Sequence, residues 1–109
     1  MIWYIQYLPE AIKDLERLDG SQRILIRKAI KKVSKNPLPD DEGGYGHPLS
    51  NKRNLKLAGF LKIKLKAAGL RVVYKLERID GQMLIIVIGV RTDEQVYEVA
   101  SKRINEYRI

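Results

Sequence analysis

Three basic side chains, Lys62, Lys64 and Arg71, have a spacing that would bring them together on one face of a β-hairpin. Residues two apart on a strand point to the same face, and a turn and a second strand follow the two lysines. Neighbouring cations disfavour one another's charged form, so a lysine in such a cluster is suited to accept a proton near neutral pH. Arginine keeps its charge and can hold a phosphate at two points. These residue types therefore suit proton transfer at a phosphate.

Two further residues, Arg91 and Tyr97, follow the apolar segment from Met83 to Val90 and are expected at the same end of the sheet. An aromatic ring beside a cationic groove is a common means of holding an unstacked RNA base. The five residues together suit cleavage of RNA by its own 2′-hydroxyl, which requires proton transfer and neutralisation of a growing phosphorane charge. No metal is needed for that chemistry.

These residues also have a purely structural interpretation. Lysines on alternate positions of a strand can be the solvated face of an antiparallel sheet, and Arg71 would simply extend that face. Tyr97 can be a core aromatic residue with an exposed hydroxyl. The sequence alone leaves both interpretations open.

Basic residues are concentrated in one quarter of the chain. Between Lys52 and Arg78, nine basic residues accompany one acid, Glu77, so this segment alone accounts for the formal net charge of +8. Such a local positive field concentrates polyanions and binds phosphates by releasing counterions. We therefore expect an RNA partner, with RNA-binding residues in addition to the five above: Lys52, Arg53, Lys56, Lys66 and Lys75.

Length and composition set further limits. A chain of 109 residues is expected to form a single domain spanning 1–109 around one core. It has no cysteine and one histidine, His47, so we expect neither a metal site nor a cofactor. No segment resembles a signal peptide or a membrane span, which predicts a cytoplasmic protein without a membrane partner.

The first half of the chain is predicted to form a strand and two helices. A strand over Ile2–Tyr7 is ended by Pro9, and an amphipathic helix then runs to Leu18. Ser21 is a candidate cap for a second helix, which ends before Asn36-Pro37. The apolar positions assigned to that helix are Ile24, Leu25, Ala29, Ile30 and Val33. The Gly- and Pro-rich segment Asn36–Ser50 is predicted to be a loop.

The second half has the period-two pattern of strands. A four-residue loop would pair Lys66 with Arg71 and Leu65 with Val72, which gives one apolar face and one lysine-rich face. The apolar face would comprise Leu61, Ile63, Leu65, Val72, Tyr74 and Leu76, and the other Lys62, Lys64, Lys66, Arg71, Val73 and Lys75. Met83–Val90 is apolar throughout, as expected of a central strand, and a last helix is predicted from Glu94 to Tyr107.

Several sequence blocks resemble one protein family. They are the run Leu61–Lys66, the segment Gly69–Tyr74, the motif Ile88–Arg91 and the helix positions Val96-Tyr97 with Ala100–Arg103. In this order and spacing they resemble the RelE branch of the RelE/ParE toxin superfamily over nearly the whole chain. The resemblance implies an α+β fold of the RelE-like microbial RNase type, with two N-terminal helices packed on a small antiparallel sheet and a C-terminal helix.

The resemblance also implies a function. It would make the chain the toxin of a type II toxin–antitoxin system, an endoribonuclease that cleaves mRNA in the ribosomal A site, with a cognate antitoxin, the ribosome and mRNA as partners. The family's catalytic lysines fall on Lys62 and Lys64, its phosphate-stabilising arginine on Arg71, its proton-donating arginine on Arg91 and its base-stacking tyrosine on Tyr97. All five match in residue type.

The chain departs from the family pattern at two positions, and one alternative function is carried forward. Lys66 stands where RelE often has arginine, and Asp93 where it has a basic residue. The alternative is a ParE-like inhibitor of DNA gyrase, which uses the same scaffold without catalysis. Family members that rely on a Glu/His pair fit poorly, because His47 lies in the predicted loop.

Overall fold

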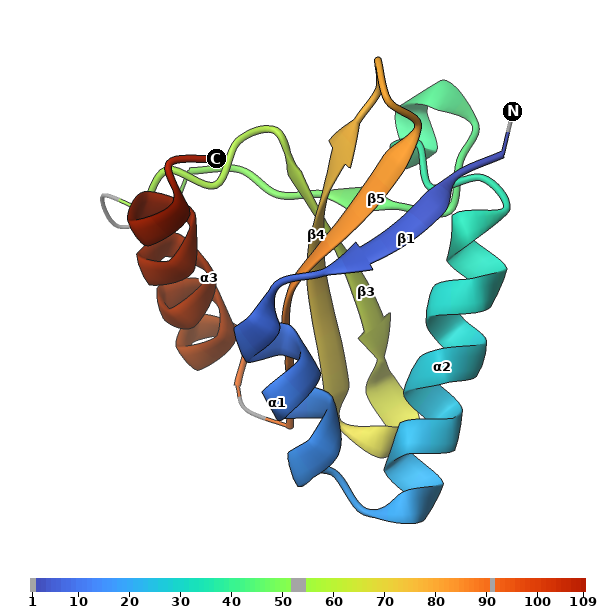
Figure 1. The fold of residues 1–109 in the computed structure, drawn as a ribbon, viewed down its shortest axis with the longest axis vertical. Helices are drawn as coiled ribbons and strands as arrows, with labels where there is room; N and C mark the ends of the chain where they lie inside the picture. Colours follow the sequence, from blue (N-terminus) through green and yellow to red (C-terminus); the bar gives the residue numbers. More distant parts are fainter. Residues whose placement is uncertain (1, 52–54, 91) are drawn as a thin grey trace.

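The protein is an α+β structure in which a five-stranded sheet lies between helices (Figure 1). The computed structural model describes residues 2–51, 55–90 and 92–109. The strands are β1 (Tyr4–Tyr7), β2 (His47–Pro48), β3 (Phe60–Leu65), β4 (Leu70–Glu77) and β5 (Gln82–Gly89), and the helices are α1 (Pro9–Arg17), α2 (Gly20–Ser34) and α3 (Asp93–Tyr107). No helix among the described residues has the length and apolar character needed to cross a membrane.

The sheet has the order β1-β5-β4-β3-β2 and is mixed, where the sequence predicted an antiparallel sheet. The difference comes from β1, which pairs in parallel with β5, while all other pairs are antiparallel. Two helices separate β1 from the remaining strands in sequence, so no hairpin turn dictates its direction. The central place predicted for the apolar segment is confirmed, since β5 lies between β1 and β4.

The register of β3 against β4 differs by two residues from the predicted one. Lys64 pairs with Arg71 and Leu65 with Leu70, so the predicted pairing of Lys66 with Arg71 is wrong. Lys66–Ala68 form a 3-10 turn, which Gly69 closes with a φ of +66° that glycine adopts without strain. A shift of two residues keeps every strand side chain on its face. The predicted division into two faces therefore holds for the strand residues, and only Lys66 leaves the cationic face.

Helix α2 begins two residues earlier than predicted and has a different cap. The Asp19 carboxylate accepts the backbone N–H of Gln22 at 2.8 Å, and the Ser21 hydroxyl donates to that carboxylate. Ser21 is therefore not the cap. The predicted apolar stripe is also rotated, because Ile24 and Leu25 are exposed while Ile26 is fully buried.

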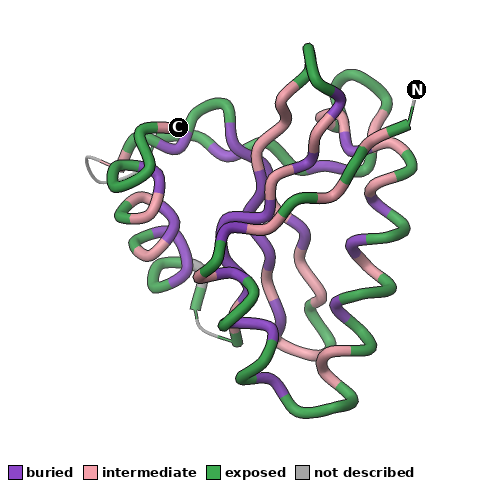
Figure 2. Tube along the Cα trace, in the orientation of Figure 1, coloured by how far each residue is buried: buried purple, intermediate pink, exposed green. Residues whose placement is uncertain are grey.

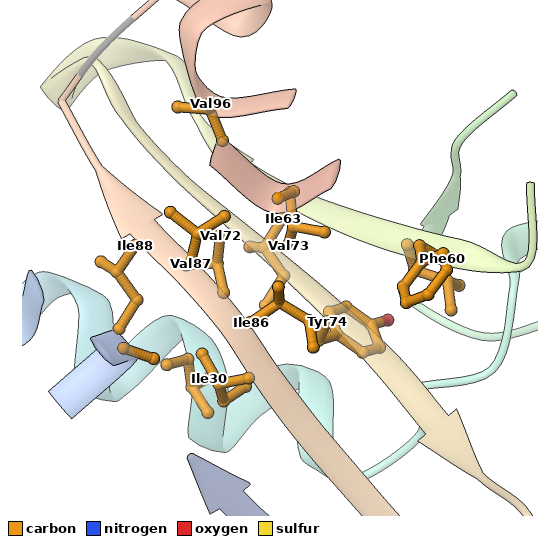
Figure 3. Close-up of a cluster of buried hydrophobic side chains, with 14 of the residues drawn as sticks. Ile30, Phe60, Ile63, Val72, Val73, Tyr74, Ile86, Val87, Ile88 and Val96 are labelled. Atoms are coloured by element: carbon orange, nitrogen blue, oxygen red, sulfur yellow. The ribbon is translucent and has the colours of Figure 1, made fainter. Parts of the chain in front are cut away.

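Both faces of the sheet are covered. In Figure 1 helices α2 and α3 lie on opposite sides of the strands, and in Figure 3 Ile30 of α2 and Val96 of α3 approach the sheet from opposite sides. Figure 2 shows the resulting pattern, in which the sides of both helices that face the sheet are buried and the outer sides exposed. Val73, which shares its face with Lys62, is fully buried. The lysine-bearing face is thus partly covered by α3 and is not a solvated face throughout.

The segment Asn36–Ser50 has more structure than the predicted loop. It contains a 3-10 turn at Asp40–Glu42 and the short strand β2, which extends the sheet beside β3. The buried Tyr74 hydroxyl donates to the Pro37 carbonyl at 2.8 Å, and burial raises the pKa of this phenol. A Cβ at Gly46 would lie 2.2 Å from the Tyr74 hydroxyl oxygen, so this close approach requires glycine.

A buried ion pair joins α1 to α3 at the edge of β5. The Arg103 guanidinium donates to both carboxylate oxygens of Asp14, at 2.6 and 3.1 Å. Asp14 also accepts the backbone N–H of Ile88 at 3.0 Å, and Arg103 donates to the Ile86 carbonyl at 3.0 Å. Strand β1 pairs with β5 only as far as Ile85, so the ion pair bonds the β5 backbone beyond that point.

Removing one member of this pair is expected to destabilise the fold strongly. Asp14→Ala leaves the Arg103 charge and the Ile88 N–H unpaired in a buried site, which should lower the free energy of unfolding by about 3–5 kcal/mol. Urea unfolding followed by circular dichroism measures this. Glu16→Ala, an exposed acid on the same helix, is the control and should change stability by less than ~0.5 kcal/mol. A loss below ~1 kcal/mol for Asp14→Ala would contradict the assigned role.

The cap assignment gives a second test. Asp19→Ala should lower the melting temperature by roughly 4–8 °C, whereas Ser21→Ala should change it little. The hydrogen bond from the Gln22 N–H holds the pKa of Asp19 below its ordinary value of 3.8. Its stabilising effect is therefore present above about pH 3.8 and is lost as the pH falls through the lower folded-state pKa. Melting curves at several pH values should show that the melting temperatures of the two variants converge as the pH is lowered. Equal melting temperatures of the two variants at neutral pH would contradict the assignment.

Candidate active site

One residue pair of the β3–β4 hairpin forms the centre of the candidate site. Lys64 lies directly opposite Arg71, and Arg71 lies opposite Gly89 at the end of β5. Side chains of directly paired residues on one face are about 5 Å apart at their Cβ atoms. Both cations are partly exposed, and Gly89 adds no side chain to this row. The sheet therefore presents two adjacent positive charges at the end of β5.

Lys62 lies two residues before Lys64 on the same face, about 7 Å along the strand. Its ammonium group donates a hydrogen bond to the Tyr97 hydroxyl at 3.0 Å and lies 5.8 Å from the centroid of that ring. Tyr97 comes from the first turns of α3 and is only 4% exposed. The structure thus places Tyr97 against Lys62, with its ring covered and its hydroxyl fixing the lysine.

The start of α3 sets the position of Tyr97. The Thr92 hydroxyl accepts the backbone N–H of Gln95 at 3.3 Å, and the Gln95 side chain accepts the N–H of Thr92 at 3.2 Å. This reciprocal cap fixes where the helix begins after β5. Buried apolar residues of α3, Val96 among them, then hold the helix on the sheet. The predicted site residue Arg91 lies outside the described residues.

The residues predicted to bind RNA are dispersed. Lys66 is exposed in the turn next to Lys64, and Lys56 is exposed in the segment before β3. Lys75 lies on the cationic face but about 13 Å along β4 from Arg71, and it forms an ion pair with Glu77 at 3.1 Å. Lys52 and Arg53 lie outside the described residues. Among the described members of this group, only Lys66 is adjacent to the candidate site.

Lys62, Lys64 and Arg71 together can neutralise a phosphate and exchange protons with it. The geometry brings these three cations into one corner of the sheet beside the start of α3, where the helix dipole adds to the positive field. Among the described residues, no group of three His, Cys, Asp or Glu side chains is arranged to hold a metal ion. The arrangement suits a phosphate-containing ligand.

Sequence analysis missed two residues that support the site, Asp14 and Arg103. Their ion pair holds the last part of β5, which leads directly into the site. A signal was present for Asp14, because it lies at helical spacing between Ala11 and Leu18 on the otherwise apolar stripe of α1. A carboxylate on a buried stripe requires a partner.

Comparison with known proteins identifies the family. No family model matches the sequence. The chain is 33% identical over 106 residues to a protein of Escherichia coli named as a RelE-like toxin, an alignment that covers 94% of this chain and 98% of that protein. It is 28% identical over 106 residues to the mRNA interferase toxin RelE of Escherichia coli strain K12, with 95% and 99% covered. The chain belongs to the RelE family of toxins, as the motif resemblance predicted.

Solved structures support the same fold. The free-state structure of an arginine double mutant of the Escherichia coli toxin RelE matches with a TM-score of 0.74 at 24% identity, covering 95% of this chain and 99% of that chain. A RelBE toxin–antitoxin complex of Mycobacterium tuberculosis matches with a TM-score of 0.67 at 20% identity, covering 85% and 95%. The predicted α+β fold of the RelE type is therefore confirmed.

Proposed function

We propose that this protein is a ribosome-dependent endoribonuclease, the toxin of a toxin–antitoxin pair that cleaves mRNA in the ribosomal A site. The observation that carries the proposal is the pairing of Lys64 with Arg71, with Lys62 two residues away and fixed by Tyr97. Relatives named as mRNA interferases, at 28% identity over 106 residues, support the same reaction. They favour it over the gyrase-inhibitor alternative.

The reaction needs a proton acceptor, a cation beside the phosphate and a proton donor, and the described residues of this corner offer the first two. A lysine of the Lys62–Lys64 pair, in its unprotonated form, takes the proton from the 2′-hydroxyl, the 2′-oxygen bonds to phosphorus, and the bond from phosphorus to the 5′-oxygen breaks. Arg71 stabilises the extra negative charge on the phosphorane oxygens. The family resemblance assigns to Arg91 the proton that goes to the departing 5′-oxygen. The products carry a 2′,3′-cyclic phosphate and a 5′-hydroxyl.

A cognate antitoxin is the second partner in this proposal. Solved structures similar to this chain include the intact RelBE toxin–antitoxin complex of Escherichia coli, at 22% identity and a TM-score of 0.61. An antitoxin that covers the cationic corner of Lys64 and Arg71 would block access of the mRNA phosphate. Expression of this chain alone should then arrest growth, and co-expression with its antitoxin should restore it.

The chemistry is tested with programmed ribosomes and defined mRNA. Lys64→Ala and Arg71→Ala should each slow single-turnover cleavage by ~10²-fold or more, because each removes a group that acts on the transition state. Lys66→Ala removes one neighbouring charge outside the paired row and is the matched control, with an expected change below about 3-fold. A 2′-deoxy nucleotide at the cut position should abolish cleavage. Cleavage of that substrate at the normal rate, or altered DNA supercoiling without cleavage, would contradict the proposal.

The contact between Lys62 and Tyr97 gives a separate test. Tyr97→Phe removes only the hydroxyl that accepts the Lys62 hydrogen bond, and it should slow cleavage roughly 10- to 150-fold, since a hydrogen bond to a charged group contributes about 1.5–3 kcal/mol. Tyr107→Phe, the same change on the same helix at a hydroxyl bound to Glu10, should leave the rate unchanged. Single-turnover rates at saturating ribosome concentration separate this effect from binding. Full activity of Tyr97→Phe would show that the hydroxyl does not position Lys62.

A further inference from the structure

Helix α2 carries a second concentration of positive charge. Between Gly20 and Lys35 the chain has six basic residues and no acidic one, although the chain outside Lys52–Arg78 is neutral when summed. The six are Arg23, Arg27, Lys28, Lys31, Lys32 and Lys35, and all except Arg23 are exposed. Residues four apart on a helix are about 6 Å apart along its axis, so these cations form rows along the outer side of α2.

This basic helix lies away from the candidate active site. Its buried residues, including Ile26 and Ile30, pack on one face of the sheet, and Figure 1 shows α3 on the opposite side. Lys62 and Tyr97 meet on the α3 side. The helix charges therefore cannot act on the same phosphate as Lys64 and Arg71, and they need a different explanation.

Aromatic side chains accompany the cations at the C-terminal end of α2. The Lys32 ammonium lies 5.6 Å from the centroid of the Tyr45 ring, which is half exposed, and the Tyr45 N–H donates to the Asn36 carbonyl at 2.9 Å. Next to this end of the helix is an open cavity of about 440 Å³, lined by Trp3, Lys35, Asn36, Leu38 and Arg78. A cavity with an indole, an amide and a lysine has the size and chemistry to receive an unstacked nucleobase.

The 3-10 turn near this end carries three acids, Asp40, Asp41 and Glu42, which are half as many as the six basic residues in and beside the helix. Glu42 binds Arg78 through two hydrogen bonds, at 2.7 and 2.8 Å, and the pKa of Glu42 is lowered by this contact. Asp40 is hydrogen bonded to His47 at 3.0 Å. Glu42 neutralises Arg78, which lines the cavity. The cavity therefore offers mainly a surface for stacking, and the lysines and arginines of α2 supply the positive field.

We propose that α2 and the adjoining Trp3 cavity form a second RNA-binding surface, which holds the backbone of structured RNA while the Lys62–Arg71 corner acts on mRNA. The choice of RNA as partner rests on the proposed function. An RNA partner fits better than an acidic peptide because the rows of cations on the outer side of α2 end beside two aromatic residues, Tyr45 and Trp3. The surface sets ribosome affinity and leaves the chemical step unchanged.

Binding of the full-length protein to vacant ribosomes tests this proposal without requiring cleavage. The triple variant Lys28→Gln/Lys31→Gln/Lys35→Gln should weaken ribosome binding at least ten-fold at about 0.15 M salt. It should also reduce the slope of log K against log salt by about 2–3, since each phosphate contact contributes about 0.7–0.9 to that slope. The control Lys13→Gln/Arg17→Gln/Lys102→Gln removes the same charge from exposed positions elsewhere and should lower affinity and slope far less. Circular dichroism confirms that both variants are folded.

A second readout reports on the cavity itself. Trp3 is the only tryptophan, so a single-stranded RNA oligonucleotide should quench the intrinsic fluorescence of the wild-type protein and of the control variant, but not of the α2 variant at the same concentration. Ribosome binding by the α2 variant equal to that of the control would overturn the proposal. If the α2 variant lost antitoxin binding while its RNA binding was unchanged, α2 would be a protein-docking surface, and this result would also overturn the proposal. A wild-type protein that binds RNA through α2 without cleaving it would refute the proposed function alone.

Discussion

The arrangement of the whole molecule depends on how the backbone N–H and C=O groups along the edge of β5 find hydrogen-bond partners beyond the end of β1. Pro9 turns the chain away from the sheet to start α1, so β1 cannot continue alongside β5. The carbonyl of Ile86 and the N–H of Ile88 are then bonded by the side chains of Arg103 and Asp14. Buried backbone groups require such partners. This ion pair links the first helix, the central strand and the last helix, and the strand that it holds leads into the candidate site.

Packing of α3 divides one face of the sheet into a structural and a chemical part. Under the helix, Val73 and Val87 are buried, as expected for a core. Beyond the start of the helix, Lys64 and Arg71 remain partly exposed. Lys62 lies at the boundary, where the hydroxyl of the buried Tyr97 accepts a hydrogen bond from its side chain. A lysine held in this way keeps its position while substrate approaches, which lowers the cost of ordering it during reaction.

Features encoded by local patterns were predictable, and those set by packing between distant segments were not. Period two predicted the two faces of β3 and β4, because a shift of two residues, such as the 3-10 turn at Lys66–Ala68 introduces, leaves faces unchanged. The choice of Asp19 over Ser21 as cap was not predictable, since both residue types are good caps and they lie only two residues apart. For the candidate site, residue types and spacing were enough to predict that Lys62, Lys64 and Arg71 share one face. The burial of Tyr97 could not be predicted in this way, because it depends on how α3 packs on the sheet.

The distribution of charge over the surface was the least predictable property, because the net charge of a segment does not say where its charged side chains lie or which of them are paired. The segment Lys52–Arg78 contains the whole net charge, yet Lys75 in it is paired with Glu77. The rest of the chain sums to zero, yet six of its basic residues are concentrated in and beside α2 and its acids lie elsewhere. A small protein that must contact a polyanion at two places needs such segregation, because a uniform charge gives affinity without orientation. Two cationic surfaces on opposite sides of one sheet would fix how the toxin is oriented between two RNA segments.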